Sequence, residues 1–243
     1  MSGRVVLVTG GTRGIGLATA VALAGDGFHV VAVARRRSEA FAAASAGVSG
    51  GSLHFIPCDL GELDRLQQLV QTIRREHGPL YGLVANAAIG TPGLLATMPD
   101  AEIGRLVHLN TLSPMLLTKY AMRGMMAAGA GRIVTIASII AFTGYNALSV
   151  YAATKASMIG FTRSLAREAG RLGVTVNAVA PGFVETEMTE SMDEAQRERV
   201  AARSALRRLV APEDVASAVA YLVSDKARNI TGTVMTVDAG STA

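Results

Sequence analysis

Tyr151 and Lys155 are the residues of this 243-residue sequence whose types and spacing most clearly suggest acid–base chemistry. A separation of four residues within a helical segment places both side chains on one face of the helix. A free tyrosine titrates near pH 10, but a neighbouring ammonium group stabilises the phenolate and lowers that pKa. Such a tyrosine can protonate a carbonyl oxygen while hydride reaches the carbonyl carbon. Alone, the pair is weak evidence, because it occurs by chance in many helices.

Two further polar residues add to this pair. Ser138 follows the apolar run Arg132–Ala137, at the end of a strand where open parallel sheets bind ligands. Its hydroxyl can hold a substrate oxygen beside Tyr151, or it can simply cap a loop. Asn110 falls inside a long helical pattern, where asparagine is a poor helix former, so either a local kink or a polar role is expected.

A glycine-rich turn follows the first apolar run and opens a helical segment. Its sequence is Thr9-Gly10-Gly11-Thr12-Arg13-Gly14-Ile15-Gly16. Gly10 permits a tight turn, while Gly14 and Gly16 let the backbone approach a pyrophosphate at the helix N-terminus. The turn predicts a dinucleotide site, and its position in the first strand–helix unit makes that signal specific.

The charge after the second predicted strand favours NADPH over NADH. An acidic residue at that point would accept hydrogen bonds from the ribose hydroxyls of NAD and repel a 2′-phosphate. This sequence instead has Arg35, Arg36 and Arg37, and Arg13 lies in the glycine turn. Arg13 and Arg35 are the predicted phosphate-binding pair, through charge-assisted hydrogen bonds. Arg36 and Arg37 are equally well explained as solvated loop residues.

The elements that must position these residues alternate regularly between strand and helix. The strand-like runs are Val5–Thr9, Val30–Ala34, Leu53–Cys58, Leu83–Asn86, Arg132–Ala137, Val174–Ala180 and Val234–Val237. The helix-like segments are Ile15–Gly25, Leu63–His77, Asp100–Met126, Ser149–Gly170 and Pro212–Ser224. Strands that are apolar throughout indicate a parallel sheet covered on both faces. The sequence therefore predicts a single α/β domain of the Rossmann type, doubly wound, spanning residues 1–243.

Composition excludes several other classes. Half of the residues are apolar, and the formal charge of +4 is spread without any long block of like charges, which disfavours nucleic-acid binding. A single cysteine, Cys58, and only four residues before the first apolar run suggest the cytoplasm, and no run is long enough to span a membrane. The histidines show no metal-ligand spacing, so no metal site is predicted.

A polar, arginine-rich stretch at 187–208 follows the sixth predicted strand. It is interpreted either as a solvated surface helix or as a lid over a cleft. Candidate pocket residues, each also explained by core packing, are Ile140, Phe142, Tyr145, Leu148, Phe183, Met188 and Met192.

In their order along essentially the whole chain, these motifs resemble the short-chain dehydrogenase/reductase family. The resemblance rests on the glycine turn, Asn86-Ala87-Ala88, Asn110, Ser138, Tyr151-x-x-x-Lys155 and Pro181-Gly182. It implies a catalytic tetrad of Asn110, Ser138, Tyr151 and Lys155, in which Lys155 also binds the nicotinamide ribose and Asn110 holds a relay water. Further implied cofactor contacts are Asp59 and Leu60 at the adenine, Asn86 and Ala87 near the ribose, and Pro181, Gly182, Val184 and Thr186 at the carboxamide. The family's usual Asn-Asn-Ala-Gly is here Ala85-Asn86-Ala87-Ala88, which predicts only a local adjustment.

Within that family, the chain is most similar to 3-oxoacyl-[acyl-carrier-protein] reductases. The similarity implies NADPH-dependent reduction of a 3-oxoacyl thioester, linked to acyl carrier protein or CoA, in fatty acid or polyketide biosynthesis, and a homotetramer. Basic docking residues of that subgroup are replaced by Gly129 and Leu172, for which Arg132, Arg167, Arg171 and the lid arginines are candidate substitutes. The alternative is a reductase or dehydrogenase of another carbonyl or alcohol, such as a small ketone, steroid or sugar.

Overall fold

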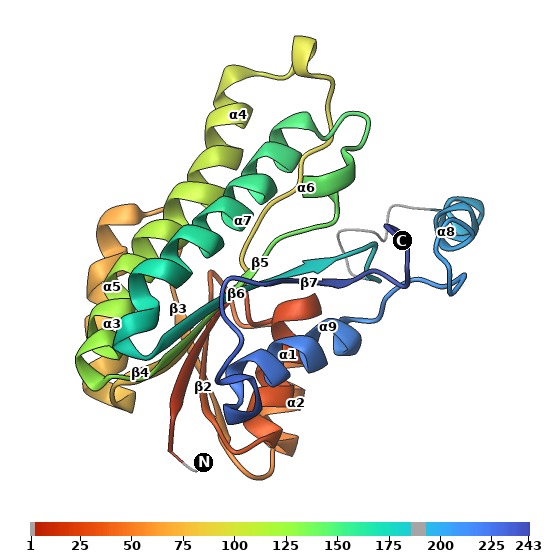
Figure 1. The fold of residues 1–243 in the computed structure, drawn as a ribbon. Helices are drawn as coiled ribbons and strands as arrows, with labels where there is room; N and C mark the ends of the chain where they lie inside the picture. The colour runs from red at the N-terminus through yellow and green to blue at the C-terminus, as the bar shows by residue number, and fades with distance from the viewer. Residues whose placement is uncertain (1–2, 186–192) are drawn as a thin grey trace.

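A seven-stranded parallel sheet lies between two layers of helices (Figure 1). The computed structural model describes residues 3–185 and 193–243. The strand order is β3-β2-β1-β4-β5-β6-β7. The strands are β1 (Val5–Thr9), β2 (His29–Ala34), β3 (Ser52–Pro57), β4 (Leu80–Ala85), β5 (Gly131–Ile136), β6 (Val174–Pro181) and β7 (Val234–Val237). The doubly wound α/β fold predicted from the sequence is confirmed.

Three long helices cover each face of the sheet. One layer consists of α1 (Gly14–Gly25), α2 (Glu39–Gly47) and α9 (Pro212–Val223), and the other of α3 (Leu66–His77), α5 (Ser113–Ala128) and α7 (Ser149–Ala169). Shorter elements are α4 (Asp100–Val107), α6 (Ile140–Thr143), α8 (Glu194–Ala201), η1 (Leu63–Arg65), η2 (Leu95–Thr97), η4 (Gly170–Leu172) and η5 (Asp225–Ala227). A π-helical turn, η3 (His108–Leu112), connects α4 to α5.

Alternate residues of each central strand enter different cores. In β1, Val6 and Val8 pack in the core under α1 and α9, whereas Val5 and Leu7 pack in the core under α3 and α5. Because both faces are covered, every residue of β1 is buried. Each buried valine or leucine stabilises the fold by roughly 1.5–3 kcal/mol. Burial on both faces therefore holds the strands in place, and their common direction sets the edge at which they end.

The functional residues follow from those strand directions. Parallel strands present all their carboxyl ends at one edge of the sheet, and the strand order reverses between β1 and β4. The glycine turn follows β1, Asn86 follows β4, and Ser138 follows β5. Ligand sites in open α/β sheets lie at this switch point, so the fold gathers these residues at one edge.

The structure differs from the predicted elements chiefly in two places. Helices α2 and α6 were not predicted; α2 is alanine-rich and buries only Phe41, so it carries little helical periodicity. The predicted helix 100–126 is interrupted by η3, with Asn110 buried inside the π-turn. The expected local irregularity at Asn110 is therefore confirmed.

Candidate active site

Close backbone packing shapes the glycine turn. A Cβ atom at Gly16 would lie 2.1 Å from the Gly10 carbonyl oxygen and 2.6 Å from Asn86 Nδ2. Gly14, which begins α1, has a φ of +50°, in the left-handed region that favours glycine. The turn therefore needs glycine at both positions.

Asn86 braces this turn from the neighbouring strand. Its Nδ2 donates to the Thr9 carbonyl at 2.8 Å and, more weakly, to the Gly10 carbonyl at 3.4 Å. The backbone N–H groups of Asn86 and Ala87 both donate to Thr9 Oγ1, at 2.9 and 3.0 Å. The departures from the family motif at Ala85 and Ala88 leave this brace intact.

The residues of the turn fit the diphosphate of a dinucleotide. All of α1 is described, and its first turn carries no acidic side chain, so the positive end of its dipole is not neutralised there. Arg13 and Arg35 are both exposed. Ser38 Oγ donates to the Thr12 carbonyl at 2.5 Å, which holds the arginine-containing segment after β2 against the glycine turn. Ser38, whose Oγ also accepts from the Phe41 N–H as the N-cap of α2, is a residue that the sequence analysis missed.

Asp59 and Leu60 lie at the carboxyl end of β3. Asp59 Oδ1 accepts a hydrogen bond of 2.9 Å from the Gly61 N–H, so this carboxylate stabilises its own turn. Leu60 is buried, and its carbonyl accepts from Ser113 Oγ at 2.7 Å. This bond ties the predicted adenine side to the start of α5.

Tyr151 and Lys155 lie in the first two turns of α7, on the face toward β5. The Lys155 Nζ is 5.7 Å from the centroid of the Tyr151 ring and donates to the Ile136 carbonyl at 2.8 Å. Lys155 is buried, with only 4% of its surface exposed. The predicted juxtaposition of these two side chains is therefore present.

The electrostatics of the pair differ from the prediction. Burial raises the pKa of Tyr151 to about 12, an effect that a hydrogen bond with Ser138 only partly offsets. Burial also lowers the pKa of Lys155 to about 8. The predicted lowering of the Tyr151 pKa by Lys155 is thus wrong for the protein alone, because desolvation of the phenolate dominates and the Lys155 ammonium group donates to the Ile136 carbonyl.

Ser138 lies directly beyond β5, as predicted, and it is buried. Its hydroxyl forms a hydrogen bond with Tyr151 and accepts a long one, 3.3 Å, from the Ile140 N–H. The residue therefore lies at the tyrosine and also takes part in the loop before α6, whereas its role in holding a substrate oxygen stays a prediction.

Asn110 holds the loop that leaves β4. Its Oδ1 accepts from the Ile89 N–H at 2.9 Å, and its Nδ2 donates to the Ile89 carbonyl at 2.8 Å and to Thr154 Oγ1 at 3.2 Å. None of these bonds goes to Lys155, so the side-chain amide acts on the backbone and on Thr154 around the site.

The predicted carboxamide segment leaves β6 at the same edge. The Gly182 N–H donates to the Val237 carbonyl at 2.9 Å, and Val184 pairs with Val210 in a short parallel bridge. Pro181 accepts from the Ile139 N–H at 3.0 Å, which connects this segment to Ser138. Thr186 lies outside the described residues.

Aromatic side chains gather on the predicted substrate side. The rings of Tyr145 and Phe183 meet edge to face, with centroids 5.8 Å apart. Phe142 is exposed, and Ile140 and Leu148 are partly buried. Met188 and Met192 lie outside the described residues, as does the beginning of the predicted lid; its later part contains α8, which Asp193 caps.

The expectation that Arg132 substitutes for a docking residue is not supported by its position. Arg132 is the second residue of β5, at the edge of the sheet opposite Ser138. It is buried, and its guanidinium lies 5.4 Å from the centroid of the Tyr81 ring and 3.6 Å from Asp225, so it is not available for docking. Arg167 and Arg171 are exposed, at the C-terminal end of α7 and in η4. Gly129 and Leu172 lie at this same end of the sheet, because the Gly131 N–H donates to the Gly173 carbonyl. These two arginines therefore stay candidate substitutes for the docking residues.

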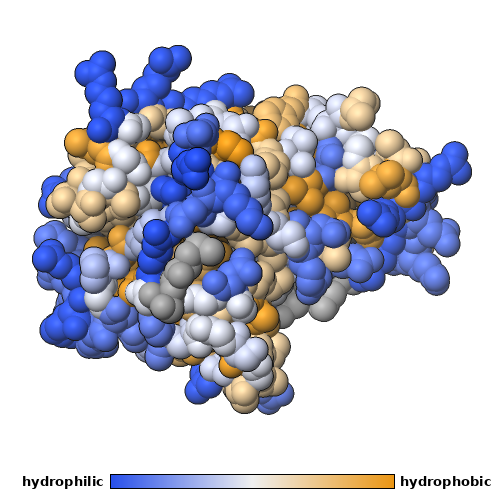
Figure 2. All heavy atoms as spheres, turned by 60° about the horizontal axis from the view of Figure 1, so that its bottom comes forward, coloured by the Kyte–Doolittle hydropathy of each residue, from blue (hydrophilic) through white to orange (hydrophobic). Residues whose placement is uncertain are grey.

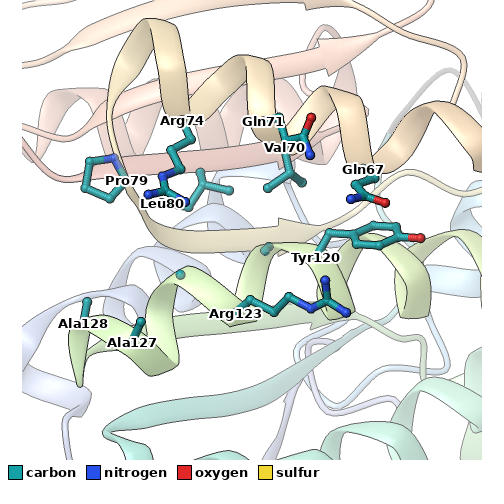
Figure 3. Close-up of a pocket in the computed structure, with 12 residues that line it drawn as sticks. Gln67, Val70, Gln71, Arg74, Pro79, Leu80, Tyr120, Arg123, Ala127 and Ala128 are labelled. Carbon is teal, nitrogen blue, oxygen red and sulfur yellow. The ribbon is translucent and has the colours of Figure 1, made fainter.

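A hollow of about 500 Å³ lies between α3 and α5, and none of the predicted site residues lines it (Figure 3). Hydrophilic side chains are spread around the face seen in Figure 2 and do not form one stripe. Within residues 3–185 and 193–243, no helix could cross a membrane and no cluster of three or more His, Cys, Asp or Glu could hold a metal.

Comparisons with known proteins agree with this geometry. Residues 10–242 match a protein-family model described as "Enoyl-(Acyl carrier protein) reductase". The chain is 40% identical over 238 residues to the 3-oxoacyl-[acyl-carrier-protein] reductase FabG of Escherichia coli (strain K12), covering 98% of this chain and 97% of that protein. It is 38% identical over 240 residues to the protein of the same name from Vibrio harveyi, covering 99% and 98%. A solved "short chain dehydrogenase/reductase family protein" superposes with a TM-score of 0.89 at 36% identity, covering 98% of this chain and 97% of the other.

Proposed function

Since the chain belongs to the short-chain dehydrogenase/reductase family, we propose that it is an NADPH-dependent reductase that converts 3-oxoacyl thioesters to 3-hydroxyacyl thioesters in fatty acid biosynthesis. The observation that carries the proposal is the meeting of Tyr151, Lys155 and Ser138 at the switch point of the sheet, beside a glycine turn that fits a diphosphate. The names of the relatives supply the substrate class.

The family uses a nicotinamide cofactor, and Arg13 and Arg35 support NADPH over NADH. Both guanidinium groups are exposed at the carboxyl edge next to the glycine turn, where they can pair with a 2′-phosphate. Gly10, Thr12, Gly14, Ile15 and Gly16 would line the diphosphate, with Asp59, Leu60, Asn86 and Ala87 toward the adenosine. Pro181, Gly182, Val184 and Thr186 would hold the nicotinamide end.

Tyr151 is the proposed general acid. The bound cofactor supplies hydride to the carbonyl carbon, and the Tyr151 hydroxyl supplies the proton to the carbonyl oxygen. A pKa held near 12 by burial keeps this hydroxyl protonated at neutral pH, which is the state that a proton donor needs. Ser138 Oγ would hold the same substrate oxygen, since it already bonds to Tyr151.

Lys155 acts after the proton has left the tyrosine. Its pKa of about 8 leaves it mostly as the ammonium form at neutral pH, 5.7 Å from the ring that becomes a phenolate. A positive charge at that distance in a buried site stabilises the phenolate. Two of its three N–H groups remain after the bond to Ile136, enough to contact the cofactor ribose and a relay water.

Five further assignments belong to this proposal. The chain is one domain whose 187–208 stretch covers the substrate, and acyl carrier protein or CoA delivers that substrate. The enzyme is a cytoplasmic homotetramer in which α5 and α7 pack against symmetry mates, because α7 exposes the small residues Ala153, Ala156 and Gly160 along one side.

The test is a substrate panel on the full chain, followed by the loss of reduced nicotinamide absorbance. Acetoacetyl-CoA and acetoacetyl-acyl carrier protein are compared with crotonyl-CoA and simple ketones, each with NADPH and NADH. We expect the acetoacetyl thioesters with NADPH to give the highest kcat/KM. Oxidation of NADPH only with an unrelated ketone, or only with the enoyl thioester, would show that the substrate assignment is wrong.

Tyr151→Phe tests the catalytic assignment separately. The substitution removes only the hydroxyl, so kcat should fall by about 10²–10⁴ while NADPH affinity is retained. An unchanged kcat would contradict the role of Tyr151 without affecting the cofactor assignment.

A further inference from the structure

The hydroxyl of Thr154, a residue of α7, is buried between the Asn110 side chain and the backbone of that helix, which also carries Tyr151. It directly precedes Lys155, and only 2% of its surface is exposed. Its Oγ1 donates to the Tyr151 carbonyl at 2.7 Å and accepts from Asn110 Nδ2 at 3.2 Å. One side chain thus connects α7 to the π-turn η3.

The direction of these hydrogen bonds determines which way the Asn110 amide faces. A threonine hydroxyl has a single proton, and here the Tyr151 carbonyl receives it, so Thr154 offers Asn110 only lone pairs. The NH2 group of Asn110, and not its carbonyl, must therefore face Thr154. Thr154 selects one of the two possible orientations of the Asn110 amide.

That orientation is the one that satisfies Ile89 completely. With its NH2 toward Thr154, Asn110 also donates to the Ile89 carbonyl and accepts from the Ile89 N–H. A flipped amide would set oxygen against the hydroxyl and the carbonyl, and NH2 against the Ile89 N–H. Buried groups left unpaired in this way cost about 1–3 kcal/mol each.

The loop that Asn110 holds returns to the beginning of α7. The Gly93 N–H, four residues after Ile89, donates to the Ala147 carbonyl at 2.8 Å, and α7 begins two residues after Ala147. Ala147 has a φ of +62°, a strained conformation that persists only when its surroundings hold it. The exit of β4, the π-turn and the start of α7 therefore form one hydrogen-bonded circuit beside Tyr151.

We propose that Thr154 is a positioning residue of the reductase proposed above. By fixing the Asn110 amide, its hydroxyl holds the loop after β4 and the start of α7 in the arrangement that sets Tyr151 opposite the substrate. The proposal concerns geometry, and Thr154 itself touches neither substrate nor cofactor.

The test compares Thr154→Val, which keeps the shape but removes the hydroxyl, with Thr154→Ser, which keeps the hydroxyl. The matched control is Thr162→Val, because Thr162 is another buried threonine of α7 and its Oγ1 lies 2.9 Å from Thr135 Oγ1, two turns further on. The measurements are kcat, the KM for NADPH, and hydrogen exchange of the Ile89 amide.

We expect Thr154→Val to lower kcat about tenfold, because small misplacements of catalytic groups have effects of this size. Its KM for NADPH should change less than twofold, and Ile89 should lose protection from exchange. Thr154→Ser should restore both kcat and protection, and Thr162→Val should leave both at the wild-type level.

Three results would overturn the proposal. These are a Thr154→Val enzyme with wild-type kcat, an equal loss in Thr154→Val and Thr154→Ser, or an equal loss in Thr162→Val, which would indicate general destabilisation of α7. The exchange measurement needs no activity. If the wild-type chain reduced no thioester, the proposed function would fail while Ile89 protection still decided whether Thr154 fixes the circuit.

Discussion

Gly16→Ala should damage the proposed cofactor site and the fold together. The added methyl group would lie 2.1 Å from the Gly10 carbonyl oxygen, whereas real Cβ contacts essentially never fall below 3.0 Å. Either the turn or the N-terminus of α1 must therefore shift by about 0.9 Å, the difference between these two distances. The same methyl group would displace Asn86 Nδ2, which braces the turn.

The size of the effect follows from the rigidity of both neighbours. Forcing an extra carbon into packed backbone costs about 1–3 kcal/mol. For a chain of this length, that lowers the Tm by roughly 2–12 °C. Loss of one charge-assisted hydrogen bond to a phosphate costs about 1.5–3 kcal/mol, so the Kd for NADPH should rise by about 10- to 100-fold.

Gly25→Ala, at the other end of the same helix, is the matched control. Nothing lies within 4 Å of a Cβ built at Gly25, and its φ is not in the left-handed region. Alanine there should raise stability by up to about 1 kcal/mol. Thermal melts with and without NADPH give both quantities, since a bound ligand raises the Tm. A Gly16→Ala protein with wild-type Tm and wild-type NADPH response would refute the close packing on which the cofactor site depends.

Two further predictions concern charge. Arg35→Asp should raise the KM for NADPH at least tenfold and lower the KM for NADH. Arg37→Asp makes the same charge change over the Phe41 ring and should alter the ratio of these two KM values less. Equal effects of the two variants would contradict the role of Arg35. Lys155→Met should raise the Tm at pH 7, because lowering the pKa of Lys155 from 10.5 to about 8 costs the fold about 3 kcal/mol. The unfolded chain binds the Lys155 proton more tightly than the folded chain, so wild-type stability rises with pH between about 8 and 10.5. The difference in Tm between Lys155→Met and the wild type should therefore shrink across that window. A constant difference would show that the charge of Lys155 is not its cause.

Much of the fold could be predicted because the strands are apolar on both faces. Every residue of β4 is buried, for example, so it reads as a continuous apolar run, although it begins three residues before the predicted start at Leu83. Helix α2 could not be found in this way, since it precedes the outermost strand β3 and buries Phe41 alone. Ser38 before Glu39 was nevertheless a usable capping signal.

Which edge a residue occupies was also readable from the sequence. Ser138 follows its strand, whereas Arg132 is the second residue of the same strand, so parallel topology places them at opposite edges. The burial of Arg132, which argues against a docking role, could not be read from this order. The ion pair of Arg132 with Asp225, and the hydrogen bond from the Tyr81 hydroxyl to the same carboxylate, indicate that Arg132 secures the amino ends of the strands.

The pKa of Tyr151 could not be predicted, because the spacing of residues does not report how deeply each is buried. The outcome also changes what the site is suited to do. At a pKa of about 12, only roughly one tyrosine in 10⁵ is ionised at pH 7. The pair therefore rests as phenol and ammonium, which is ready to protonate a carbonyl oxygen and then to stabilise the phenolate.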